Sequence, residues 1–139
     1  MKAINAVILT AASISLGGCA MAPSAADLQA QQHYQDTIPT CSSPKECEVK
    51  WSAARNWVLN NCGFRIEKME PDYIETYKSG DSSDTNLYCR VTKSAVSETE
   101  YRIELAAGAN NFLMYMGSAH TALLQGFNDA VNQSWHGSP

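Results

Sequence analysis

The stretch from Ser43 to Gly63 limits most strongly what this chain can fold into. Ser43 can cap a helix, Pro44 suits the first helical position, and Glu46 is placed to close a capping box. Apolar residues then recur at helical spacing until Gly63, which is a natural helix terminator. The apolar stripe consists of Cys47, Trp51, Ala54, Val58 and Cys62. The pattern predicts one amphipathic helix with a cysteine near each end.

The first 18 residues have the order of an export signal. Lys2 gives a positive start, and a run of apolar or small residues follows from Ala3 to Leu16. This run is shorter than the roughly 20 residues that a membrane-spanning helix needs. It ends in Leu16-Gly17-Gly18-Cys19, which resembles the lipobox of bacterial lipoproteins. The resemblance implies cleavage before Cys19 and lipidation of that cysteine. An ordinary signal peptide that is cut a few residues later, for example after Ala22, is the alternative.

The residues after Cys19 give two further expectations. Residue 20, directly after the cysteine, is Ala. In the bacterial lipoproteins that this chain resembles, an Asp at that position favours retention in the inner membrane. We therefore expect an outer-membrane anchor with the domain in the periplasm, held firmly because such lipoproteins carry more than one acyl chain. The stretch 19–40 is rich in Ala, Gln, Ser and Pro. It has too little apolar surface for burial to offset the conformational entropy lost when a chain becomes ordered. It is predicted to be a flexible tether, followed by a folded domain over residues 41–136.

Four cysteines remain after Cys19, and an even number in an exported chain indicates disulfides. Cys47 and Cys62 lie 15 residues apart on the predicted helix, which is about 22 Å by its rise. A disulfide needs Cα atoms within roughly 7 Å, so these two cannot pair. Cys41 precedes the helix and cannot reach Cys62 at its far end. The only complete set left is Cys41–Cys47 with Cys62–Cys89. A metal or redox site is the weaker alternative, because the sequence has no CxxC motif.

Short stretches that alternate apolar and polar residues follow the helix. They predict four strands, at 64–67, 73–77, 87–92 and 101–107, joined by turns such as Glu70-Pro71-Asp72. Ser118 is placed to cap a second amphipathic helix. We therefore predict an α+β fold in the order helix, four strands, helix. Its form is a two-layer sandwich, with a four-stranded antiparallel sheet and both helices on one face.

Two features are typical of binding surfaces. The polar face of the predicted sheet holds tyrosines and arginines, which are common at interfaces. They are Tyr73, Tyr77, Tyr88, Arg90 and Arg102. The second feature is the segment 110–116 with Phe112 and Tyr115, which is too apolar for an ordinary loop. The alternatives are a solvated sheet face, and a segment that folds over the edge of the core or extends the fourth strand.

No catalytic pattern stands out in the sequence. His33 lies in the predicted tether, His120 at a helix start and His136 in the tail, and no nucleophile stands at a recognisable motif spacing. Glutamates on the polar sheet face share it with arginines, so ion pairs explain them better than acid–base catalysis. The formal net charge is −4 and there is no basic run, which argues against nucleic-acid binding. We expect no enzymatic activity, no cofactor and no metal.

Several of these residues also support a resemblance at the level of family. Cys47-Glu48, Trp51, Ala54-Arg55 and Trp57-Val58, followed by Ile74-Glu75-Thr76, look like a family of small proteobacterial lipoproteins that has no established activity. In element order, the domain also resembles the helix-grip repeats of the NlpB-type accessory lipoprotein of the outer-membrane barrel-assembly machine. The shared pattern is a helix ending in Gly-Phe-x-Ile, two hairpins and a helix. The resemblance implies an accessory role in the envelope, by analogy of fold alone.

The sequence thus predicts an outer-membrane lipoprotein with a disulfide-stabilised, non-enzymatic periplasmic domain. Its expected partner is an envelope protein or a glycan. A small envelope hydrolase that acts near the cell wall is the alternative from another class, and a purely structural envelope protein is the third.

Overall fold

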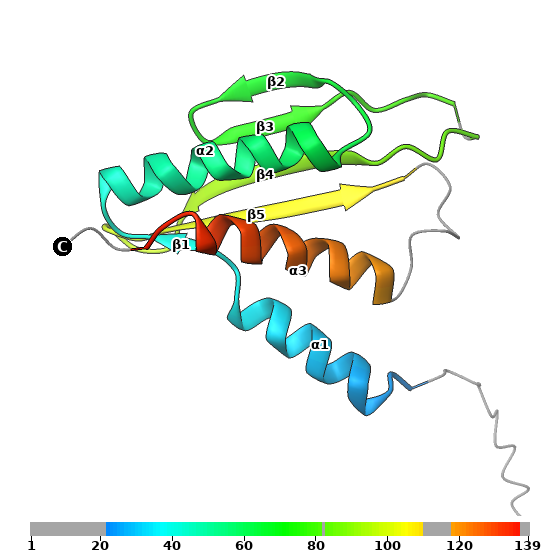
Figure 1. The fold of residues 1–139 in the computed structure, drawn as a ribbon, viewed down its shortest axis with the longest axis horizontal. Helices are drawn as coiled ribbons and strands as arrows, with labels where there is room; N and C mark the ends of the chain where they lie inside the picture. Colours follow the sequence, from blue (N-terminus) through cyan, green and yellow to red (C-terminus); the bar gives the residue numbers. More distant parts are fainter. Residues whose placement is uncertain (1–21, 82, 110–117, 137–139) are drawn as a thin grey trace, which may run out of the picture.

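The computed structural model describes residues 22–81, 83–109 and 118–136 of the 139-residue chain. The elements follow in the order α1 (Ala25–Asp36), β1 (Thr40–Cys41), α2 (Pro44–Asn61), β2 (Ile66–Glu70), β3 (Tyr73–Thr76), β4 (Tyr88–Ala95), β5 (Tyr101–Gly108) and α3 (Ser118–Gln133). The strands form one antiparallel sheet in the order β1-β5-β4-β3-β2. Helices α2 and α3 lie side by side over one face of the sheet, and α1 lies beyond α3 (Figure 1).

The α+β class and the antiparallel sheet agree with the prediction, but the numbers of elements do not. The described residues form three helices and five strands rather than two helices and four strands. The additional elements are α1 and β1, and both lie before residue 42. The predicted meander of four strands is present as β2 to β5, but its first strand lies at Ile66–Glu70 instead of 64–67. Short turns join β2 to β3 and β4 to β5, whereas the longer stretch 77–87 joins β3 to β4.

Helix α2 forms for the reasons that its sequence indicates. The Ser43 hydroxyl accepts the backbone N–H of Glu46, and Pro44 is the first helical residue. Ala54 and Val58 are completely buried on the face that meets the sheet. The capping box is shifted by one residue, because the Glu46 carboxylate accepts the N–H of Ser42 instead of the N–H of Ser43.

The core lies between the sheet and the helices α2 and α3. Alternate residues of the strands point inward, and Ile74, Val91 and Leu105 form one buried row across β3, β4 and β5. Helix α3 contributes Phe127, whose ring meets Trp57 of α2 edge to face at 5.4 Å between centroids. Further buried members of this cluster are Cys89, Ile103 and Val131.

The prediction of a flexible tether over residues 19–40 is wrong from Ala25 onward. Ser24 and Asp27 form a complete capping box that starts α1, although no residue of this helix is fully buried. The contacts that hold the segment lie at its C-terminal end, where Ile38 and Pro39 are buried. Pro39 then accepts the N–H of Ile103 at 2.8 Å, so the chain joins the sheet beside β5. The composition of the segment is that of a tether, but its contacts with β5 and α3 make it part of the domain.

Both predicted disulfides are present. Cys41–Cys47 joins β1 to the first turn of α2 with a Cα–Cα distance of 5.1 Å. Cys62–Cys89 joins the end of α2 to β4 at 6.1 Å. The two bridges therefore fix α2 at both ends, and its long axis is held along the sheet.

Candidate binding surfaces

The face of the sheet opposite α2 and α3, here called the outer face, carries polar and aromatic side chains in register. Strand pairing across β3, β4 and β5 sets these side chains in rows. One row consists of Tyr73, Thr92 and Glu104, and the next of Glu75, Arg90 and Ala106. Arg90 and Ala106 are exposed and the others are partly exposed, so the face is open to solvent over these strands.

Two ion pairs lie on this face. Glu75 is 3.7 Å from Lys68 of the neighbouring β2, and Glu104 is 3.9 Å from Arg102 of its own strand. These partners are well exposed, so the pairs contribute little to stability. Among the residues that the structure describes, no ion pair involves Arg90, whose guanidinium group is therefore available to a partner.

Tyr34 of α1 reaches the border of the outer face. It lines an open hollow of about 380 Å³ together with Tyr73, Arg90 and Glu104. Burial raises the pKa of the Tyr34 phenol, the negative charge of Glu104 raises it further, and Arg102 partly opposes both. The phenol therefore stays neutral and can donate a hydrogen bond from this hollow.

Tyr88 lies flat against the sheet because its neighbour is glycine. A Cβ atom on Gly108, which is opposite Tyr88 on β5, would lie 2.6 Å from the Tyr88 hydroxyl oxygen. The Nζ of Lys78 lies 4.8 Å from the centre of the same ring. Tyr77 follows β3 directly and packs edge to face against Phe64, with 5.9 Å between ring centroids.

The predicted partner residues are thus brought together only in part. Tyr73, Tyr88, Arg90 and Arg102 lie on strands of the outer face, whereas Tyr77 lies just beyond the end of β3. Phe112 and Tyr115 lie outside the described residues, as does Cys19. The sequence does not point to Tyr34, because this residue lies in the segment that is predicted to be a tether. The only local signal for it was that it is the single aromatic residue between Cys19 and Cys41.

A second concave surface lies where α2 begins, between its first turns and the β4–β5 hairpin. This α2–hairpin cleft has a volume of about 720 Å³. Cys47 and Trp51 of α2 form one wall, and Lys93 and Tyr101 of the hairpin strands form the other; Pro71 also lines the cleft. The Nζ of Lys93 lies 5.1 Å from the centre of the Trp51 ring. Sequence reasoning did not find this cleft, because its residues come from separate segments with no common motif.

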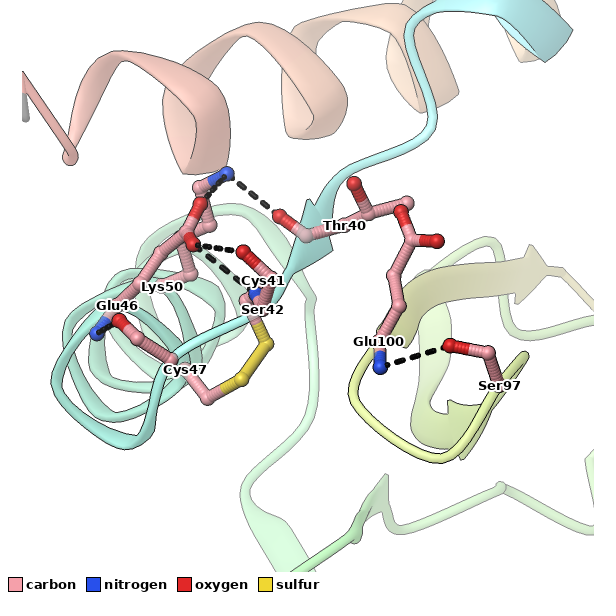
Figure 2. Close-up of a disulfide and its surroundings, with 9 residues drawn as sticks. Thr40, Cys41, Ser42, Glu46, Cys47, Lys50, Ser97 and Glu100 are labelled. Atoms are coloured by element: carbon pink, nitrogen blue, oxygen red, sulfur yellow. Dashed lines mark hydrogen bonds and ion pairs between the residues drawn. A yellow bond between two sulfur atoms is a disulfide. The ribbon is translucent and has the colours of Figure 1, made fainter.

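A buried network holds the chain behind this cleft. The ammonium group of Lys50 donates to the Thr40 carbonyl at 2.6 Å and to the Glu46 carboxylate at 2.8 Å. Burial would raise the pKa of Glu46, but hydrogen bonds from Lys50 and Ser42, together with the Lys50 charge, outweigh burial and lower it. Figure 2 shows the network beside the Cys41–Cys47 disulfide, with the hairpin that holds Ser97 and Glu100 on the other side of the bridge. The network and the disulfide fix the start of α2, and with it one wall of the cleft.

Two histidines that are far apart in the sequence line a third, open hollow of about 570 Å³ between α1 and α3. His33 and Asp27 come from α1, and His120 comes from α3. Within residues 22–81, 83–109 and 118–136, no group of three His, Cys, Asp or Glu residues is arranged to hold a metal ion. None of the helices in these ranges is long and apolar enough to cross a bilayer.

Compared with known proteins, the chain matches no protein family, and no curated sequence and no solved structure is significantly similar to it. The functional argument therefore rests on the residues and their geometry.

Proposed function

We propose that this protein is an outer-membrane lipoprotein of the periplasm whose domain binds an envelope protein through the outer face of its sheet, without catalysis. The observation that carries the proposal is the pairing of α2 and α3 on a single face of the sheet. The opposite face keeps Tyr73, Tyr88 and Arg90 at its surface. Tyrosine and arginine are the residues that most often supply binding energy at protein interfaces. The anchor is supported by Leu16-Gly17-Gly18-Cys19 and by the run before it.

The folded α1 limits how far such a domain extends from its anchor. Five residues, from Ala20 to Ser24, separate Cys19 from the first residue of α1. Fully extended, this piece of chain reaches about 20 Å. A lipid on Cys19 would therefore hold the domain close to the membrane surface. The partner we propose is accordingly a membrane protein or another lipoprotein rather than a component deep in the periplasm.

The anchor is tested by the mass of the mature protein. We expect the wild type, extracted from membranes, to have the mass of a chain that begins at Cys19 and bears acyl chains. The Cys19→Ala variant should lack them and leave the outer-membrane fraction. A mature chain that begins after Ala22 with no lipid would contradict the proposal.

The partner surface is tested by photo-crosslinking in cells. A photoreactive amino acid at position 73 or 90, on the outer face, should give an adduct of one defined mass. The same amino acid at Asn56, an exposed position of α2, serves as the matched control and should give none. Arg90→Glu should weaken the adduct formed from position 73, whereas Arg55→Glu, an equal charge change on exposed α2, should not. Equal adducts from position 73 and position 56 would contradict the proposal, as would an adduct that Arg90→Glu leaves unchanged.

A further inference from the structure

The α2–hairpin cleft combines aromatic and proline side chains with a hydrogen-bond donor. Trp51 and Tyr101 stand on opposite walls, and Pro44 and Pro71 also line the cleft. Tyr101 is 39% exposed, which is high for a large aromatic side chain. The Trp51 indole N–H has no acceptor among the described residues and is not sealed from solvent. Because it is open to solvent, a ligand in the cleft can accept this N–H in place of water.

Negatively charged side chains outnumber positively charged ones in the lining of the cleft. Glu48 of α2 and Glu98 of the hairpin line it, and neither carboxylate forms an ion pair with another described residue. The one ammonium group in the lining is that of Lys93, which lies over the Trp51 ring. Two free carboxylates therefore face a single cation that already has an aromatic partner. This arrangement complements a ligand with a positive charge.

The free carboxylates of Glu48 and Glu98 favour a peptide with a basic side chain over a neutral sugar. A polyproline II segment has no internal hydrogen bonds, so its carbonyls are free to accept from an indole N–H. Segments of this kind dock in grooves lined by aromatic side chains. The volume of about 720 Å³ lies in the range of known ligand sites.

We propose that the α2–hairpin cleft binds an extended, proline-containing segment of another protein that carries a basic side chain. A proline of the segment packs between Trp51 and Tyr101, a backbone carbonyl accepts the Trp51 N–H, and the basic side chain pairs with Glu48 or Glu98. The Cys41–Cys47 bridge holds the α2 wall in place before binding, which lowers the entropy that binding costs. This site is separate from the outer face of the sheet, so it can exist whether or not that face binds a partner.

The test uses the mature lipoprotein in detergent micelles and a short synthetic peptide of repeated Pro-Pro-Arg triplets. Binding is measured by titration calorimetry. We expect the double variant Glu48→Gln/Glu98→Gln to bind at least tenfold more weakly, since both carboxylates that can pair with an arginine are lost. Trp51→Phe, which keeps an aromatic ring and removes the N–H, should weaken binding several-fold. Glu67→Gln, at an exposed position of β2, is the matched control and should bind like the wild type.

Three comparison ligands make the result decisive. A Pro-Pro-Glu peptide should bind at least tenfold more weakly than Pro-Pro-Arg, and a Gly-Ser-Arg peptide should also bind more weakly because it has no preformed polyproline helix. A chitin oligosaccharide should show no binding that depends on Trp51. Circular dichroism confirms that each variant is folded. The proposal is overturned if Pro-Pro-Arg does not bind, if the glutamate variants bind it as well as the wild type, or if the oligosaccharide binds instead. Arg90→Glu should leave peptide binding unchanged, which separates this test from that of the outer face.

Discussion

Removal of the two disulfides, one at a time, tests how α2 is held on the sheet. The double variants are Cys62→Ala/Cys89→Ala and Cys41→Ala/Cys47→Ala. The first bridge closes a loop with a sequence separation of 27 residues, and the second closes one of 6 residues. The loop-closure relation gives about 3.6 kcal/mol for the longer loop and about 2.4 kcal/mol for the shorter one.

Apart from loop closure, the two variants lose similar amounts of buried side-chain packing. Cys89 and Cys41 are both almost completely buried, while Cys62 and Cys47 are partly buried. Replacement of a buried cysteine by alanine leaves a small cavity that costs about 1 kcal/mol in either variant. This cost cancels in the comparison, so the difference between the variants measures loop length. We expect Cys62→Ala/Cys89→Ala to be the less stable variant by about 1 kcal/mol.

The assay is urea denaturation of each mature protein, followed by circular dichroism. Free energies of unfolding from linear extrapolation should rank wild type, Cys41→Ala/Cys47→Ala and Cys62→Ala/Cys89→Ala in decreasing order. The melting temperature of the last variant should fall by roughly 15 °C. If the two variants were equally stable, or if loss of the short loop cost more, loop closure would not explain how these bridges stabilise the domain.

Three other perturbations follow from the polar contacts. Lys50→Met should lower the free energy of unfolding by about 3 kcal/mol because it breaks a buried ion pair, whereas Lys68→Met should change it by less than about 0.5 kcal/mol; urea denaturation measures both. The lowered pKa of Glu46 stabilises the fold above its ordinary value of 4.5, and this stabilisation should be lost as the pH falls through the lowered pKa. Glu46→Gln should therefore flatten the dependence of stability on pH below about 4.5, and an unchanged slope would refute this assignment. Asn128→Ala removes the donor to the Tyr34 carbonyl, so hydrogen exchange should speed up in α1 while the strands keep their protection.

The elements that could be predicted from the sequence are those whose stabilising contacts are local. Helix α2 was predicted from its cap, its proline and its apolar stripe, all within one stretch of chain. The disulfide pairing followed from that helix, since a rigid rod excludes the other pairings. The four strands of the meander were predicted from the local alternation of apolar and polar residues, although the first was placed at 64–67 and β2 spans Ile66–Glu70.

The misassigned elements depend on contacts between distant parts of the chain. The Asn128 side chain donates to the Tyr34 carbonyl, 94 residues away, and the Asn132 side chain donates to the Thr37 carbonyl, 95 residues away. Polar side chains on a helix leave no periodic signal of such bonds. The two-residue strand β1 is too short to show any alternation, so nothing local distinguished it from a loop. The α2–hairpin cleft was missed because its lining residues come from separate segments of the chain.

The position of Tyr34 links the proposed anchor to the proposed partner surface. Tyr34 lies on α1, which would follow a lipid on Cys19 after only five residues, and its phenol lines the hollow on the outer face with Tyr73 and Arg90. A partner that covers this hollow would contact α1 and the sheet together. Binding would then stabilise the docking of α1, which by itself buries no residue completely. Under the proposed function, the segment next to the anchor is therefore a part of the interface as well as a connection to the membrane.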